Sequence, residues 1–512
     1  MNLSKWKQSS LSLMFVIVVA KLVGVLRDII LANYYGTTNI SDAYLIASSV
    51  PTLLFYFIGH ALSTAYIPMY NKAKAEQGAE KAQRFSNNLL NTALLASVCI
   101  ALVLCLFPQA VIKVFAAGFD GPTAQLAARL IRISCPSILL MAIVNVWSGY
   151  LQANKSFLAP AAISLPRNFA VVLSIIVAAK LGTDWLGAGL LGAYILETAF
   201  LLPFVYRKQY RYGLILNLRD EYMQQTMYMV MPIFLGVCVG QINKIVDRSM
   251  ASTIAEGGIS ALTYASIINN AIQEVLVTGL ITILFASCAE LVARNEIPQV
   301  KKKLSDTIAV AGTLLIPGSV GVFLLAEPIV ELILCRGEFN RHSLDMTVSA
   351  LRCYTAGLLF LAMRDTLVKV FYAFQETKIT TAASIASICL NIVLNVVLGR
   401  TIGIEGLAMA TSLSIGFNCV ILWTYLRRKI GDFGRTKIFR VMWKSGAGSV
   451  VMGLMAHYGY PLLAKNHSGL TALFLTIMGS CVIYAGTQVL LANEAVMAVV
   501  AGQQRKNEKQ SD

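Results

Sequence analysis

The sequence is poor in charged residues: Asp, Glu, Lys and Arg make up only 13% of its 512 residues. Soluble domains carry about 25%, so we do not expect a soluble globular protein. The chain also lacks a nucleotide-binding P-loop and the G-x-S-x-G motif of serine hydrolases. Its four His and ten Cys include no C-x-x-C pair and predict no His-based metal site. Any active process must therefore use an ion gradient, the membrane potential or a substrate gradient.

What the sequence has instead is apolar residues, at 57% of the chain with a mean hydropathy of +0.67. Runs of about 20 apolar residues are long enough to cross a bilayer as helices. They predict an all-α polytopic membrane protein with about fourteen transmembrane helices. The predicted spans are 9–34, 40–68, 86–116, 126–151, 158–181, 186–206, 224–252, 258–290, 306–335, 346–373, 379–400, 404–426, 438–460 and 469–493.

The basic residues predict the orientation of these spans. Loops on one side carry 26 of the 42 Lys and Arg residues, and loops on the other side carry 5. Cytoplasmic loops are enriched in Lys and Arg, so both termini are expected in the cytoplasm. This distribution also accounts for the net charge of +16 without a nucleic-acid partner. Lys5 and Lys7 precede an apolar run that continues too far for a cleavable signal peptide.

Four charged residues stand close together in or beside the first two spans: Lys21, Arg27, Asp28 and Asp42. Charges within a bilayer are costly unless they face one another or a wet cavity. Lys21 and Asp28 are seven residues apart, which places them near one face of a helix. We interpret the group as a cationic patch that lines a polar cavity and binds an anion such as phosphate. Alternatively, Arg27 and Asp28 lie at a helix end and extend to the interface.

An internal repeat favours a transporter. A shift of 219 residues places Asp28 on Asp247 and Ser41 on Ser260, so helices 1–6 match helices 7–12. Because six is even, the two copies have the same topology and are related by an axis along the membrane normal. We therefore predict an N-terminal lobe over 1–212, a pseudo-symmetric C-terminal lobe over 213–430, and helices 13–14 with a cytoplasmic tail over 431–512.

A second polar group predicts an ion site. Asp247, Asn391, Asn395 and Thr411 supply a carboxylate, two amide oxygens and a hydroxyl within predicted spans. Hard cations such as sodium prefer oxygen ligands of this kind. Two alternatives stay open. In the first, the Asn and Thr side chains only join helices by hydrogen bonds. In the second, Asp247 pairs with neighbouring Arg248 or Lys244.

Several stretches resemble one known family. These are KLVGVLRDIILANYYGTTNISDAYLIASSVPTLL near the N-terminus, ALSTAYIPMY, LILCRGEF and FYAFQETK. They are similar to the MurJ (MviN) family of the multidrug and oligosaccharidyl-lipid exporter superfamily, over all fourteen predicted helices. The resemblance implies no enzyme but a flippase of the bacterial inner membrane. Its substrate would be lipid II, the undecaprenyl-pyrophosphate-linked peptidoglycan precursor, moved to the outer leaflet by alternating access. Membrane lipids and cell-wall synthesis proteins are the other implied partners.

The resemblance also implies roles for individual residues. The substrate cavity would include Lys21, Arg27 and Asp42. At the position of Lys21 the family usually has Arg. The family's sodium site falls on Asp247, Asn391, Asn395, Thr411 and the backbone of Leu407. One member has an acid at the position of Asn395, so sodium would bind more weakly here. Helices 13 and 14 would form a groove for the lipid tail.

The chain departs from the family pattern at two places. After Pro51, paired arginines are replaced by Phe55 and Tyr56, and helix 8 has Ile267 and Asn270 where Arg and Glu are expected. Glu274 lies one turn further on. These changes leave open a flippase for another polyprenyl-pyrophosphate-linked oligosaccharide. A drug/cation antiporter, a membrane enzyme and a scaffold that has lost transport are further alternatives. The basic first lobe argues against the antiporter.

Overall fold

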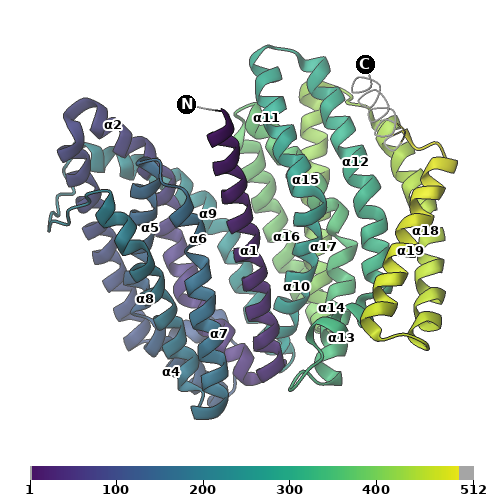
Figure 1. The fold of residues 1–512 in the computed structure, drawn as a ribbon, viewed down its shortest axis with the longest axis horizontal. Helices are drawn as coiled ribbons and strands as arrows, with labels where there is room; N and C mark the ends of the chain where they lie inside the picture. Colours follow the sequence, from purple (N-terminus) through teal and green to yellow (C-terminus); the bar gives the residue numbers. More distant parts are fainter. Residues whose placement is uncertain (1–2, 495–496, 498–512) are drawn as a thin grey trace. The chain divides into compact units, whose positions relative to one another are not determined.

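The computed structural model describes the backbone of residues 3–494 and 497. It also describes their side chains, except those of residues 3–11, 57–58, 60–64 and 231–239. These residues form α-helices joined by short turns, with no β-strand among them (Figure 1). A helix satisfies its backbone hydrogen bonds within one segment, and a chain in lipid requires this because no water can replace those bonds. The all-α fold predicted from the apolar runs is confirmed.

The helices fall into three groups along the chain. The first group contains α1 (Leu3–Tyr35), α2 (Asn39–Leu106), α3 (Pro108–Phe115), α4 (Gly121–Ser134), α5 (Ser137–Ala153), α6 (Leu158–Ala162), α7 (Ser164–Leu181) and α8 (Asp184–Arg207). The second contains α9 (Glu221–Ile254), α10 (Gly258–Gln273), the π-helical turn η1 (Glu274–Thr278), α11 (Gly279–Ala293), α12 (Ile297–Leu324), α13 (Ala326–Leu334), α14 (Arg341–Ala356), α15 (Leu358–Ala373), α16 (Thr377–Ile402) and α17 (Ile404–Ile430). The chain then continues with α18 (Arg435–Ala464) and α19 (Gly469–Leu490).

The first two groups repeat the same order of helices. Shifted by 219 residues, α1 superposes in sequence on α9, the short α3 on α13, and α8 on α17. Helices α4 and α5 form a broken span bent by 47°, and their counterparts α14 and α15 are bent by 45°. Helix bounds and bends are independent of the few identities that first indicated the repeat. The pseudo-symmetric architecture is therefore confirmed.

By their contacts, the helices form two compact units. The first unit is Met1–Ser260 with Arg336–Phe339, and the second is Ala261–Cys335 with Asn340–Asp512. Within the first unit, α2 packs against α4, α5 and α9, and α7 packs against α8 (Figure 1). Within the second, α12 and α19 both pack against α18, and α16 packs against α17. The lobe boundaries predicted from sequence stay predictions.

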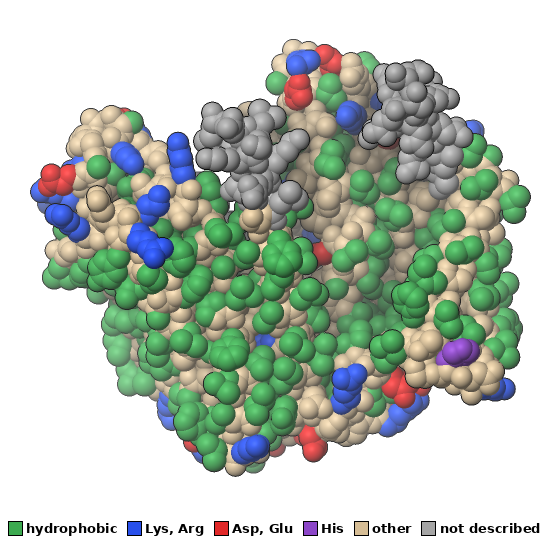
Figure 2. All heavy atoms as spheres, in the orientation of Figure 1, with side chains coloured by type: hydrophobic (Ala, Val, Ile, Leu, Met, Phe, Trp, Pro, Cys, Tyr) green, Lys and Arg blue, Asp and Glu red, His purple; other side chains and the backbone are tan. Residues whose placement is uncertain are grey.

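The exposed surfaces suit a lipid environment. Eight helices are long and apolar enough to cross a membrane, or up to ten if each bent pair is one span, among the described residues. Large apolar side chains such as Phe169, Leu173 and Val482 are exposed on the helix flanks. Figure 2 shows hydrophobic side chains along the helices and charged ones mainly near helix ends. The chain is thus a multi-pass membrane protein, although the predicted count of fourteen spans is not confirmed.

Helix α2 differs most from the predicted spans. The loop expected between residues 68 and 86 is helical on both sides, and only Gly78, with φ of 85°, turns the chain. Glycine suits this turn because the left-handed region costs it no steric strain. At its other end α2 stops at Leu106 and the separate helix α3 begins at Pro108, inside the predicted third span. Proline starts α3 because its missing N–H is not needed at the first helical position.

Candidate functional site

The first unit contains a polar cavity of about 370 Å³, which we call the cationic cavity. Helices α1, α2, α4, α5, α7, α8 and α9 all contribute to its wall. Its described lining residues are Arg27, Asp28, Tyr44, Leu45, Ala47, Ser48, Ser49, Pro51, Thr52, Leu53, Ser134, Ser137, Met141, Arg167, Val171, Leu190, Ala193, Tyr194, Lys244 and Arg248. Four of these are bases and one is an acid. Such a surplus of cations in a partly dry site favours an anionic ligand.

Arg27 and Asp28 of α1 form the most highly connected part of this wall. The guanidinium of Arg27 donates to Asp28 Oδ1 from Nε at 2.9 Å and from Nη2 at 2.7 Å. Its Nη1 donates to Asn168 Oδ1 of α7 at 3.1 Å. The side chain of Arg27 is 32% exposed and that of Asp28 is 16% exposed. Arg27 is therefore oriented by two partners at the cavity wall, and a substrate-binding role of Arg27 and Asp28 stays a prediction.

Three further bases, which sequence analysis did not assign to the substrate cavity, also line it. Arg167 comes from α7, and Lys244 and Arg248 come from α9. Nη1 of Arg248 is buried and donates no hydrogen bond to any described residue. A buried guanidinium donor without an acceptor is costly, and an anionic oxygen in the cavity would satisfy it. Sequence analysis had named Lys244 and Arg248 only as alternative partners of Asp247.

The other two predicted substrate residues lie elsewhere in the first unit. Lys21 of α1 is exposed and is not among the described residues that line the cavity. Asp42 of α2 is only 1% exposed and is also absent from that lining. Asp42 Oδ1 accepts hydrogen bonds from Ser260 N at 2.8 Å and Ser260 Oγ at 2.5 Å. It thus caps the first turn of α10, while its role toward a substrate, like that of Lys21, stays a prediction.

Around Asp42 the contacts follow the internal repeat. Ser41 Oγ and Ser260 Oγ, which are repeat counterparts 219 residues apart, hydrogen bond to each other at 2.8 Å. Gly118 packs against the carbonyl of Ser252, and Gly337 packs against the carbonyl of Asn33. The 219-residue shift places Gly118 on Gly337 and Asn33 on Ser252, so the two contacts are reciprocal. Reciprocal contacts are what a local two-fold relation produces.

The predicted sodium ligands are divided between the two units. Asp247 of α9 is in the first unit and accepts a hydrogen bond from Asn243 Nδ2 at 3.1 Å. The second unit holds the rest: Asn395 Nδ2 donates to Asn391 Oδ1 at 3.0 Å on α16, and Thr411 Oγ1 donates to Leu407 O at 3.1 Å on α17. Among described residues no three His, Cys, Asp or Glu cluster as metal ligands. The predicted set, with one carboxylate, is of another kind and stays a prediction.

A multi-pass helical bundle with an internal repeat and a cation-lined cavity is the architecture of a membrane transporter. Residues 31–479 match the family model described as "Lipid II flippase MurJ". The chain belongs to the MurJ family, as its motifs indicated.

Relatives and solved structures agree with this assignment. The chain is 25% identical to "Probable lipid II flippase MurJ" of Rickettsia prowazekii over 94% of this chain and 97% of the relative. The Thermotoga maritima protein of the same name is 26% identical over 93% and 94%. A solved "Lipid II flippase MurJ, inward closed conformation" superposes with a TM-score of 0.81 at 22% identity, over 94% of this chain and 99% of that chain. An inward-facing multidrug transporter of the MATE family gives 0.66 at 15% identity, over 83% and 99%. These likenesses fit a multi-pass protein of a bacterial inner membrane.

Proposed function

We propose that this chain translocates lipid II from the cytoplasmic to the outer leaflet by alternating access. The cationic cavity carries the proposal, because four bases facing one acid suit the diphosphate of a lipid-linked precursor. The family description and the relatives' names point to the same substrate. A cavity for cationic drugs would need the opposite charge, so the antiporter alternative has less support.

In this mechanism Arg27 and Arg248 bind the diphosphate oxygens from two helices of the first unit. Asp28 and Asn168 hold Arg27 in place so that little side-chain entropy is lost on binding. The polyprenyl tail stays in the surrounding lipid. The distribution of Lys and Arg in the loops supports a cytoplasmic location of both termini.

A second candidate substrate is another polyprenyl-diphosphate-linked oligosaccharide. The observation that favours it lies on α2, where Phe55 is buried and Tyr56 is 38% exposed at the positions of the family's paired arginines. Their loss removes two cations from this part of the chain, which would alter recognition of a charged head group.

Reconstituted vesicles test the proposal directly. Purified chain is incorporated into vesicles with fluorescent lipid II, and a membrane-impermeant reductant bleaches the accessible label. We expect bleaching beyond the outer-leaflet fraction of protein-free vesicles. A lipid with the same tail and a different glycan forms the second arm. Faster translocation of that lipid would favour the alternative, and translocation of neither would refute both.

We further propose a sodium site built from the predicted ligands of the second unit, which are Asn391, Asn395, Thr411 and the Leu407 carbonyl. Sodium at 100 times its dissociation constant would stabilise the folded protein by about 2.7 kcal/mol. Thermal unfolding in detergent should therefore shift upward in sodium chloride but not in potassium chloride of equal ionic strength. Asn395→Leu should remove the shift, whereas Thr401→Val, at an exposed position of the same helix, should keep it. Equal shifts in both salts would contradict a specific sodium site.

A further inference from the structure

The first unit contains another cavity, of about 360 Å³, which the proposed binding of a diphosphate does not use. We call it the side cavity. Its described lining residues are Thr52, Phe55, Tyr56, Gly59, Ile67, Met141, Val144, Asn145, Ser148, Gly149, Gln152, Pro160, Ile163, Arg167, Tyr194 and Glu197. Thr52, Met141, Arg167 and Tyr194 also line the cationic cavity, so the two spaces share a wall. A ligand group in one space therefore lies next to the other space.

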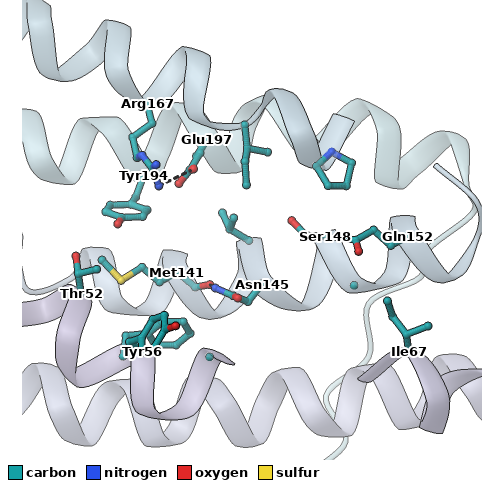
Figure 3. Close-up of a pocket in the computed structure, with 16 residues that line it drawn as sticks. Thr52, Tyr56, Ile67, Met141, Asn145, Ser148, Gln152, Arg167, Tyr194 and Glu197 are labelled. Atoms are coloured by element: carbon teal, nitrogen blue, oxygen red, sulfur yellow. Dashed lines mark hydrogen bonds and ion pairs between the residues drawn. The ribbon is translucent and has the colours of Figure 1, made fainter. Parts of the chain in front are cut away.

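Glu197 is the least expected residue in this lining. It is 1% exposed, and neither carboxylate oxygen accepts a hydrogen bond from any described residue. Arg167 Nη1 lies 3.3 Å from Glu197 Oε1, close enough for an ion pair. Figure 3 shows this pair and Tyr194 on one side of the cavity, with Asn145 and Tyr56 on the opposite side. Arg167 thus balances the charge while both oxygens remain able to accept hydrogen bonds, which a buried carboxylate requires.

The rest of the lining is rich in neutral hydrogen-bonding groups. Ser148 Oγ is buried without a hydrogen-bond partner among the described residues. Asn145 Nδ2 donates to Met141 O within its own helix, which leaves the Asn145 carbonyl oxygen to other donors. Gln152 adds an amide, and the half-exposed ring of Tyr56 adds an apolar face. Its volume is within the range of about 300–1,000 Å³ typical of small-molecule sites.

This chemistry discriminates between the parts of a lipid-linked glycan. A second phosphate would be repelled by the Glu197 carboxylate, which has only one base beside it. Sugar hydroxyl and acetamido N–H groups instead donate hydrogen bonds to a carboxylate, and they also form hydrogen bonds with amides and hydroxyls. A sugar ring also packs its C–H face on an aromatic ring. In a diphosphate-linked glycan the first sugar is bonded directly to the phosphate. A diphosphate in the cationic cavity would therefore place this sugar in the adjacent side cavity.

We propose that the side cavity is a subsite for the first sugar of the substrate, with Glu197 accepting hydrogen bonds from its hydroxyl or acetamido N–H groups. This inference rests on the proposed function only in requiring a polyprenyl-diphosphate-linked glycan, whichever glycan that is. Arg167 serves both spaces, because it stands in their common wall and pairs with Glu197. The cationic cavity then recognises the diphosphate, and the side cavity distinguishes glycan-bearing lipids from bare ones.

Binding of three lipids to the full-length protein in detergent tests the subsite. The probes are undecaprenyl diphosphate, the same lipid with one N-acetylhexosamine, and lipid II. Because Glu197→Gln removes a charge-assisted hydrogen bond, we expect it to weaken the binding of both sugar-bearing probes about tenfold. The affinity of the Glu197→Gln variant for undecaprenyl diphosphate should stay within about twofold of the wild-type value, because residue 197 does not contact the diphosphate.

Two further variants guard against misfolding and indirect effects. Ser148→Ala removes a hydroxyl that has no described partner, so the fold should tolerate it while sugar-bearing probes bind about threefold more weakly. Leu196→Ala, at an exposed position of α8, should change nothing. Equal weakening of all three probes by Glu197→Gln would overturn the subsite, since Glu197 would then act only by holding Arg167. Unchanged binding of the sugar-bearing probes by both Glu197→Gln and Ser148→Ala would also overturn the subsite. If lipid II is not translocated in vesicles but the single-sugar lipid is still distinguished, the subsite stands and the proposed substrate fails.

Discussion

Arg27→Ala should lower the initial rate of lipid II translocation in vesicles by about 10- to 100-fold. Loss of hydrogen bonds from a charged donor costs about 1.5–3 kcal/mol, which corresponds to that range. The substitution also leaves the Asp28 carboxylate in the cavity without its guanidinium partner, which adds repulsion toward an anionic substrate. The measurement is the bleaching rate of fluorescent lipid II at equal protein incorporation.

Two variants make the Arg27 result specific. Arg27→Lys keeps the charge but loses the planar fork that reaches both Asp28 and Asn168, so an intermediate rate is expected. Arg129→Ala removes an exposed arginine, 3.3 Å from Asp184, and should leave the rate unchanged. If Arg27→Ala translocates as fast as the wild type, the cationic cavity is not the route of the diphosphate.

Gly337→Ala should destabilise the folded protein by about 2–4 kcal/mol, the largest stability effect we expect from so small a change. Gly337 has φ of 58°, and a left-handed conformation costs a residue with a Cβ about 1–2 kcal/mol. An added Cβ would also lie 2.2 Å from the carbonyl oxygen of Asn33. That carbonyl accepts the neighbouring Glu338 N–H at 2.9 Å, so it cannot move without loss of a hydrogen bond.

The same substitution at Gly446 provides the control. Gly446 lies within α18, and no atom is within 4 Å of its ideal Cβ position. Alanine there should leave stability unchanged or raise it by up to about 1 kcal/mol, because alanine favours helix. Thermal unfolding in detergent at one fixed scan rate compares the two variants. Similar midpoints for both would show that the close approach of Gly337 to Asn33 contributes nothing.

Much of the fold was predictable because lipid restricts the backbone to helices. Apolar runs set most helix positions, and a 219-residue shift found from a few identities recurs in the bounds of α1 and α9. Helix ends outside the apolar runs were not predictable. Lys72 and Arg84 indicated a loop, but polar residues also continue a helix into water, so α2 turns only at Gly78.

The site was predictable only in part, because one charge in a span does not reveal what it faces. Arg27 and Asp28 were found since adjacent opposite charges have few other roles within an apolar run. Arg248 could have extended to the interface, and only the packing of α9 in the first unit places it on the cavity. Asp42 illustrates the opposite case: a carboxylate in the first turn of a helix is equally suited to a substrate or to a neighbouring helix, and here it caps α10.

Genetic complementation tests the central claim most directly. The chain is expressed in bacterial cells depleted of their own lipid II flippase, alongside Arg27→Ala and Arg129→Ala at equal membrane levels. The account predicts growth with the wild type and Arg129→Ala and lysis with Arg27→Ala. Lysis of cells that contain well-inserted wild-type protein would contradict lipid II as the substrate.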